Sequence, residues 1–167
     1  MTEVQIEPSG EDDLDVVLAL FDEAVAWLVE RGSAAQWGSE PWSQDPAKVQ
    51  RVRAMLSGGR AFLATSDGAP VGALVLDHPL PYVPPTTEPE VYVTVLLASR
   101  RHRGVGSRLL DFAKQDARER GVGLLRVDCW AGGDGSLIRY YESQGFVPVE
   151  RVHVRDDVYV QLFEQQV

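Results

Sequence analysis

The sequence has very little of the residues that build disulfide frameworks or metal centres. Cys129 is the single cysteine among 167 residues, so an intramolecular disulfide is excluded and the chain suits a reducing compartment. The three histidines are scattered and form no ligand cluster with it. The sequence therefore predicts a cytoplasmic protein without a metal site.

Long hydrophobic runs and cationic residues are also scarce. The most apolar helical stretch, Leu14 to Val29, is interrupted by Asp15, Asp22 and Glu23 and cannot span a bilayer. The first residues lack the basic start and apolar core of a signal peptide. Sixteen Lys and Arg against twenty-five Asp and Glu give a net charge of −9. Because each phosphate contact needs a cation, neither nucleic acid nor an anionic membrane is expected as a partner.

What is present is the composition of an ordinary folded domain. Hydrophobic residues make up 44% and charged residues 25%, which excludes wholesale disorder. The length suits one globular domain, and no repeat, low-complexity tract or linker divides it. We therefore expect a single domain over residues 1–167.

Hydrophobic periodicity predicts an alternation of strands and helices. In the first half we expect a strand at 4–7, a helix from about 14 to Gly32, a helix from 46 to 58, and a hairpin of strands 61–65 and 71–76. In the second half we expect strands at 91–97, 124–130, 146–154 and 158–163, and helices at about 104–120 and 134–144. Ser9 and Asp12 resemble a capping box for the first helix. The order β-α-α-β-β-β-α-β-α-β-β predicts an α/β fold with a mixed sheet.

The segment from His78 to Pro89 contains five prolines and is expected to be a loop. Long irregular loops inside compact domains are often functional. We therefore treat this segment, called the proline loop below, as a candidate wall of a site.

One short stretch is strongly basic and rich in glycine. Arg100, Arg101, Arg103 and Arg108 surround Gly104 and Gly106 where a strand ends and a helix begins; we call residues 100–108 the glycine turn. A helix N-terminus presents unpaired N–H groups and about half a positive charge, and glycines let a ligand approach the backbone. The turn therefore suits a diphosphate, although a solvated arginine cluster would have the same sequence.

Two other nucleotide motifs fit less well. A P-loop requires Lys followed by Ser or Thr after the glycines, and none is present. A dinucleotide-binding fingerprint requires a third glycine at the position of Leu109. In favour of such a site, Asp128 lies about twenty residues further along the sequence, where the acid that binds the ribose is expected. A nicotinamide-dependent dehydrogenase remains a rival interpretation.

The same residues carry a family resemblance. Arg101-x-x-Gly104-x-Gly106 resembles the Q/R-x-x-G-x-G/A signature of the GCN5-related N-acetyltransferases (GNAT), and the segment from Tyr141 to Phe146 resembles that family's Y-E-x-x-G-F motif. The two motifs occur in the family's order, with the expected strand and helix between them. The resemblance implies a GNAT-like fold, with a mixed, mostly antiparallel sheet flanked by helices, and acetyl-CoA as cosubstrate.

The resemblance also implies where acetyl-CoA binds. The pantetheine arm would lie along the strand before the glycine turn, and the diphosphate would rest on backbone N–H groups of the turn. A main-chain N–H near Leu96 or Leu97 would polarise the thioester carbonyl. The implied cofactor-binding residues are Thr94, Val95, Leu96, Arg101, His102, Arg103, Gly104, Val105, Gly106, Ser107 and Asp134.

Two of the implied roles belong to side chains. Tyr141 resembles the tyrosine that protonates the departing thiolate, and a phenol suits this because it is neutral at pH 7. Asp134 stands where the family often has asparagine, seven positions before the tyrosine. An aspartate accepts but cannot donate, so helix capping is the alternative role.

The acceptor amine must lose a proton before or during attack. Glu88 and Glu90 before the cofactor strand and Asp128 on the next strand are candidate bases, with a water chain as the alternative. We list Glu90, Asp128 and Tyr141 as the candidate catalytic residues. Cys129 lies in an alternating apolar strand, so we expect direct transfer in a ternary complex rather than an acyl-cysteine.

The expected acceptor is a primary amine of a small molecule or peptide. Trp37 and Trp42, the proline loop and the turn at Arg155 to Asp157 are candidate walls of its site, and packing alone would also explain the tryptophans. The acidic surplus favours a cationic amine. Many GNAT proteins pair through their C-terminal strands, so a homodimer is a further expectation. A degenerate member that binds coenzyme A as a sensor without turnover is the alternative function.

These interpretations differ in the cofactor that stabilises the protein. We expect acetyl-CoA to raise the melting temperature in a thermal-shift titration, because a ligand that binds only the native state stabilises it by mass action. NAD serves as the control and should leave the melting temperature unchanged. Stabilisation by NAD alone would contradict the acetyltransferase prediction.

Overall fold

The computed structural model describes residues 3–31 and 37–167 and has the predicted order of elements. Its strands are β1 (Val4–Ser9), β2 (Arg60–Ser66), β3 (Ala69–Asp77), β4 (Glu90–Ala98), β5 (Leu124–Trp130), β6 (Val147–Arg155) and β7 (Val158–Gln166). Its α-helices are α1 (Leu14–Glu30), α2 (Pro46–Gly58), α3 (Val105–Glu119) and α4 (Ser136–Ser143), and two short 3-10 helices are η1 (Glu11–Asp13) and η2 (Trp42–Gln44). The predicted end of the first helix at Gly32 lies outside the described residues.

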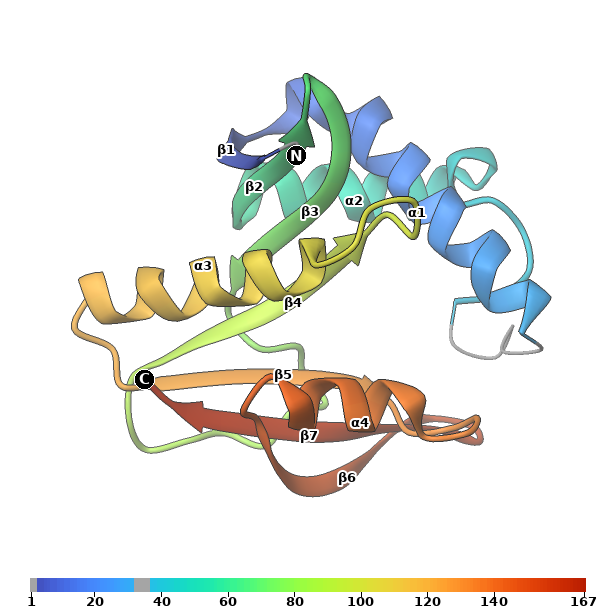
Figure 1. Cartoon of the computed structure of the whole chain (residues 1–167). Helices are drawn as coiled ribbons and strands as arrows, with labels where there is room; N and C mark the ends of the chain where they lie inside the picture. Colours follow the sequence, from blue (N-terminus) through green and yellow to red (C-terminus); the bar gives the residue numbers. More distant parts are fainter. Residues whose placement is uncertain (1–2, 32–36) are drawn as a thin grey trace. The chain divides into compact units, whose positions relative to one another are not determined.

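The residues group into two compact units (Figure 1). The first consists of Met1–Asp77 and Val95–Leu109, and the second of His78–Thr94 and Leu110–Val167. The single domain expected from the sequence stays a prediction. In the first unit the strands follow the order β1-β2-β3-β4, and in the second β4-β5-β7-β6, so β4 belongs to both. The result is a mixed, mostly antiparallel seven-stranded sheet flanked by helices, as predicted.

A tight hairpin and two helices build the first unit. β2 and β3 are antiparallel, and the turn between them places Asp67 and Gly68 at φ of 52° and 77°, a conformation that Asp-Gly adopts at low cost. α2 begins as predicted, with Pro46 in its first turn and the Asp45 carboxylate accepting the Ala47 N–H at 3.0 Å. Within the described residues, no helix is long and apolar enough to cross a membrane.

The predicted capping box at Ser9 is wrong. Ser9 is the last residue of β1, and its hydroxyl donates to the Asp13 carboxylate at 2.7 Å rather than accepting a helical N–H. The short 3-10 helix η1 separates Ser9 from α1, whose N-cap is Asp13 without a side-chain hydrogen bond. The motif has the right spacing for a cap, but the strand extends two residues further than its apolar pattern indicated.

Close backbone packing fixes β3 beside the C-terminal half of β4. The Ser99 N–H donates to the Val71 carbonyl at 2.7 Å. A Cβ atom on Gly72 would lie 2.6 Å from the Leu97 carbonyl oxygen and 2.7 Å from Val105 Cγ1. Only glycine fits here, and its absence of a side chain lets α3 begin against β3.

The second unit carries the parallel pair of the sheet. β4 and β5 are parallel over Glu90–Val93 and Leu124–Val127, and β7 runs antiparallel to both β5 and β6 (Figure 1). A parallel pair requires a crossover connection, which α3 supplies. The ring of Tyr141 on α4 packs against Phe146 and Phe163, with ring centroids 5.9 and 5.5 Å away.

Candidate active site

The glycine turn has the backbone geometry of an anion site. Gly104 lies at φ 79°, a conformation that glycine adopts without strain, and apart from its chain neighbours no atom of the described residues lies within 4 Å of the position its Cβ would take. The Arg108 N–H donates to the Gly104 carbonyl at 3.1 Å, which begins the hydrogen-bond ladder of α3. The first N–H groups of the helix therefore point out of an exposed turn. These features fit the diphosphate of a coenzyme A derivative.

The four arginines of the glycine turn divide into two pairs. The Arg100 guanidinium stacks on the Trp27 ring at 3.6 Å, and Arg108 Nη2 donates to the Val4 carbonyl at 3.1 Å. Arg101 and Arg103 are exposed beside the start of α3. Contacts within the protein therefore account for Arg100 and Arg108, whereas Arg101 and Arg103 are the two cations best placed to contact a phosphate.

A carboxylate on α1 anchors this turn. Glu23 Oε1 accepts the Ser99 hydroxyl at 2.9 Å and the Arg100 N–H at 3.2 Å, and the Ser99 hydroxyl in turn accepts the Arg101 N–H at 3.3 Å. Trp27 lies one helical turn after Glu23, so both contacts come from one face of α1. The sequence-based predictions did not include this role of Glu23 in supporting the glycine turn. The signal that could have indicated it is the presence of an acidic residue within an otherwise apolar helix.

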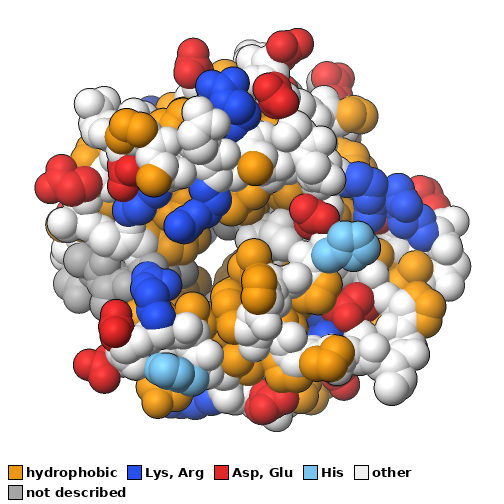
Figure 2. Space-filling model, turned by 180° about the vertical axis from the view of Figure 1, so that it is seen from behind, with side chains coloured by type: hydrophobic (Ala, Val, Ile, Leu, Met, Phe, Trp, Pro, Cys, Tyr) orange, Lys and Arg blue, Asp and Glu red, His pale blue; other side chains and the backbone are white. Residues whose placement is uncertain are grey.

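Figure 2 shows Lys and Arg side chains interspersed with Asp and Glu among the described residues on the side of the molecule that it draws.

The strand before the turn holds the residues predicted to bind pantetheine. Thr94, Val95 and Leu96 directly follow the stretch of β4 that pairs with β5. Val95 is buried in the core of the first unit, whereas Thr94 and Leu96 are half-buried. Alternation along a strand puts these last two side chains on the same face.

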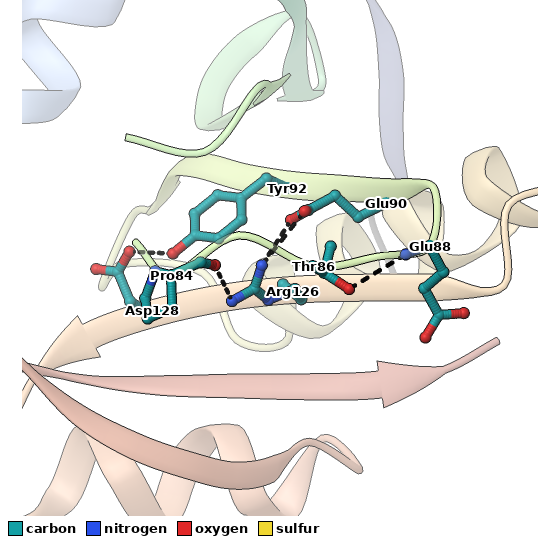
Figure 3. A network of polar contacts seen from close by, with 7 residues as sticks. All are labelled: Pro84, Thr86, Glu88, Glu90, Tyr92, Arg126 and Asp128. Atoms are coloured by element: carbon teal, nitrogen blue, oxygen red, sulfur yellow. Dashed lines mark hydrogen bonds and ion pairs between the residues drawn. The ribbon is translucent and has the colours of Figure 1, made fainter. Parts of the chain in front are cut away.

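A polar cluster lies on one face of the parallel strands of the second unit. Glu90 and Tyr92 alternate on β4, Arg126 and Asp128 alternate on β5, and Tyr92 is registered directly opposite Arg126. Figure 3 shows these four side chains converging between the two strands. Two predicted catalytic residues, Glu90 and Asp128, are thus brought into one cluster.

Arg126 is the most buried charge of the cluster. Its side chain is 5% exposed, and Nη1 contacts both Glu90 carboxylate oxygens at 3.2 and 3.3 Å. Nη2 donates to the Pro84 carbonyl at 2.9 Å, which ties the proline loop to β5. The Glu88 carboxylate points away from this cluster (Figure 3). Glu90 is therefore engaged by a permanent cation, whereas Glu88 enters the network drawn through its backbone N–H, which donates to the Thr86 hydroxyl at 3.5 Å.

Asp128 has two phenols as partners. The Tyr92 hydroxyl donates to Oδ2, and the Tyr82 hydroxyl lies 3.3 Å from each carboxylate oxygen. Burial raises the pKa of Asp128, and the hydrogen bonds from Tyr92 and Tyr82 act in the opposite direction because they stabilise the ionised form. The result is a carboxylate whose pKa lies above its usual range.

Tyr141 and Cys129 are buried beside this cluster. Burial raises the pKa of the Tyr141 phenol, and the neighbouring Cys129, Tyr140 and Asp128 raise it further. Burial also raises the pKa of the Cys129 thiol to about 12, with a smaller contribution from Asp128. At neutral pH both groups keep their protons, so Tyr141 is a potential donor and Cys129 is a poor nucleophile.

Asp134 and the tryptophans have structural contacts. Asp134 Oδ1 accepts the N–H of Ser136, the first residue of α4, at 2.9 Å, but the N-cap of the helix is Gly135, so this contact is an Asx turn before α4 and not the N-cap considered above. The Trp42 ring stacks on Phe21 at 4.4 Å within the core of the first unit. Trp42 is only 5% exposed, so core packing explains it, and Trp37 packs against the same cluster.

The structure adds three residues that sequence reasoning missed. Tyr82, Tyr92 and Arg126 complete the contacts of the two carboxylates. Tyr82 lay within the loop singled out for its prolines, but no pattern linked it to Asp128, 46 positions away. Within the described ranges, no group of three or more His, Cys, Asp or Glu could hold a metal ion.

The fold and the geometry of the glycine turn fit one class of protein, the acyl-CoA-dependent transferases. The family model described as "Acetyltransferase (GNAT) family" matches residues 19–146. The chain therefore belongs to the GNAT family, as its motifs indicated. It is an acetyltransferase, and acetyl-CoA is its cosubstrate.

Solved structures share this fold. A GCN5-related N-acetyltransferase from Rhodopseudomonas palustris ("Aminotransferase, Class-II") is 22% identical, with TM-score 0.74 over 100% of this chain and 98% of that one. The ribosomal-protein-alanine N-acetyltransferase from Brucella melitensis is 22% identical, with TM-score 0.63 over 98% and 99%. The PaiA N-acetyltransferase from Thermoplasma acidophilum, solved with coenzyme A, is 14% identical, with TM-score 0.70 over 99% of each chain. No curated protein matches the sequence.

The contacts of Glu90 predict a structural effect of its removal. We expect Glu90→Ala to lower the free energy of unfolding by about 3–5 kcal/mol, because it leaves Arg126 buried without its counter-charge. Urea denaturation measures the change. The matched control is Glu88→Ala, which should stay within about 0.5 kcal/mol of the parent. Equal stability of both variants would contradict the assignment of Glu90 to a buried ion pair.

Proposed function

We propose that this enzyme transfers an acetyl group from acetyl-CoA to a primary amine of a small molecule or peptide, by direct attack in a ternary complex. The observation that carries the proposal is the Asp128 carboxylate, which is half-buried, is partnered by two phenols and interacts electrostatically with Tyr141. An amine acceptor requires a base, and departure of a thiolate requires an acid. The second unit contains one group suited to each task.

Backbone groups are proposed to hold the cosubstrate. The N–H groups of Arg101 to Ser107 would bind the diphosphate, supported by the charges of Arg101 and Arg103, and the peptide groups of Thr94 to Leu96 would align the pantetheine arm. When bound, acetyl-CoA supplies the acetyl group as a thioester. Asp134 is proposed to hold the turn that leads into α4, since its carboxylate already accepts the Ser136 N–H.

Asp128 is the proposed general base. A base is most effective when its pKa approaches the working pH, and burial moves the pKa of Asp128 in that direction. Glu90 is less suited because Arg126 contacts both of its oxygens and occupies lone pairs that a substrate proton would need. Asp128 has phenol partners instead, and these leave lone pairs on its oxygens for an incoming ammonium.

Tyr141 is the proposed proton donor to the leaving thiolate. Its buried phenol stays protonated at neutral pH because burial raises its pKa. The charge on Asp128 raises this pKa further, so protonation of Asp128 by the acceptor would make the phenol a better donor. Proton uptake at Asp128 and proton release at Tyr141 would thereby support each other.

The charge distribution supports a cationic acceptor. Four of the sixteen Lys and Arg lie between Arg100 and Arg108, so the remainder of the chain is more acidic than the net charge of −9 indicates. An ammonium group is attracted to such a surface, whereas a carboxylate is repelled. We also propose a homodimer, as the family resemblance implies, and a cytoplasmic setting, which suits the buried free thiol of Cys129.

The proposal predicts thiol release that depends on an amine and on Asp128. Across a panel of primary amines, we expect coenzyme A production with at least one cationic acceptor. Asp128→Asn should lower kcat/KM for that acceptor by about 10²- to 10⁴-fold, the range of general base catalysis. Asp111→Asn, which removes an exposed carboxylate on α3, is the control and should match the parent.

Two outcomes would contradict this prediction. Full activity of a folded Asp128→Asn variant would remove Asp128 as the base. Binding of acetyl-CoA without thiol release for any amine would instead identify a coenzyme A-binding module without turnover.

Direct transfer predicts that the cysteine is dispensable. Cys129→Ser should retain turnover, because the buried thiol has a pKa of about 12 and holds its proton at working pH. Steady-state kinetics should also show intersecting rather than parallel lines when both substrates are varied. A folded Cys129→Ser variant without activity would favour an acyl-cysteine mechanism.

A further inference from the structure

The partners of Asp128 come from two different parts of the second unit. Tyr92 lies on β4 and is fully buried, and its hydroxyl donates to Oδ2. Tyr82 lies in the proline loop, is half-buried, and its hydroxyl is 3.3 Å from both oxygens. The shorter contact to Tyr92 is the stronger one, because O–H···O hydrogen bonds weaken beyond about 3.0 Å. The carboxylate is therefore held more tightly at Oδ2 than at Oδ1.

The proline loop is itself fixed in place. Arg126 Nη2 donates to the Pro84 carbonyl at 2.9 Å, and the Val83 N–H donates to the Leu80 carbonyl at 2.9 Å. The Val83 side chain is 8% exposed and belongs to a core cluster that also contains Tyr92. Tyr82 lies between these two anchored stretches, so its hydroxyl is presented to Asp128 by a stiff segment rather than by a mobile one.

We infer that Tyr82 and Tyr92 are positioning residues that hold the Asp128 carboxylate in one orientation for proton transfer from the acceptor amine. Tyr92 binds Oδ2, and Tyr82 contacts both oxygens more weakly from the loop side, so Oδ1 is the less firmly held oxygen and keeps a lone pair to accept the amine proton. In that step an N–H bond of the ammonium breaks, an O–H bond forms at Oδ1, and both electrons of the N–H bond stay on nitrogen. The inference rests on the proposed role of Asp128 as base.

Other charged and titratable groups lie around Asp128 and its two phenol partners. Arg126 on β5 faces Tyr92, and Arg155 on β6 interacts with Tyr82. Cys129 on β5 and Tyr141 on α4 sense the charge of Asp128. These groups remain unchanged in the variants below, so a change in the titration of Asp128 reports the lost hydroxyl.

The test compares Tyr92→Phe and Tyr82→Phe in the full chain. The pKa of Asp128 is measured by ¹³C NMR of the labelled carboxyl carbon, assigned by its loss in Asp128→Asn. Each hydroxyl stabilises the ionised carboxylate, so its removal should raise this pKa, by about one pH unit for Tyr92→Phe and by less for Tyr82→Phe. The acidic limb of the kcat/KM profile should move to higher pH by the same amount. At a fixed pH on that limb, kcat/KM of Tyr92→Phe should therefore be about tenfold lower than that of the parent.

Tyr159→Phe is the matched control. This tyrosine is 46% exposed on β7 and its ring packs against His153, so removing its hydroxyl should change neither the titration of Asp128 nor the pH profile. If Tyr92→Phe fails to fold, Tyr82→Phe decides the question, because Tyr82 is only half-buried at the edge of the core cluster that contains Tyr92 and its substitution disturbs the packing less.

The possible failures are distinguishable. If Asp128→Asn is impaired but neither phenylalanine variant shifts the titration or the pH profile, the inference is overturned and the proposed base remains. If a folded Asp128→Asn variant keeps full activity, the proposed base is wrong and the inference falls with it, whatever the titration shows.

Discussion

The pairing of the buried Arg126 guanidinium organises the second unit. A charge that is 5% exposed requires compensation, and Arg126 obtains it from the Glu90 carboxylate and the Pro84 carbonyl. The first contact fixes the start of β4 and the second fixes the proline loop. Tyr92 and Tyr82, which lie on those two segments, are thereby brought to Asp128. A structural ion pair thus supports the proposed base without belonging to the chemistry.

In the first unit, the glycine turn is likewise held in place by a charged side chain. Glu23 accepts from the Ser99 hydroxyl and the Arg100 N–H, and Trp27 receives the Arg100 guanidinium. These contacts satisfy polar groups at the end of β4 and leave the N–H groups at the start of α3 to a ligand. In each unit a charged side chain, Glu23 or Arg126, holds in place the backbone segment that carries proposed binding or positioning groups.

Local sequence signals predicted the elements well because each has a local cause. Asp45-Pro46 started α2, Asp67-Gly68 turned the hairpin, and the glycine turn followed a β-branched strand, as expected. The prediction that Ser9 caps the first helix was wrong because Ser9 belongs to β1, where it pairs with Ala61 of β2. Contacts between distant positions, such as Tyr82 with Asp128 or Arg126 with Pro84, depend on strand register and loop path. No periodicity in one sequence contains that information.

The central claim is that an enzyme carboxylate, rather than bulk solvent, removes the proton from the acceptor. The most direct measurement is the pH dependence of kcat/KM for two primary amine acceptors that differ in basicity. If Asp128 takes the proton from a bound ammonium, the acidic limb has the same midpoint for both acceptors, because it reports the free enzyme. A midpoint that follows the pKa of each amine would show that only the neutral amine from solution reacts, and it would contradict the account.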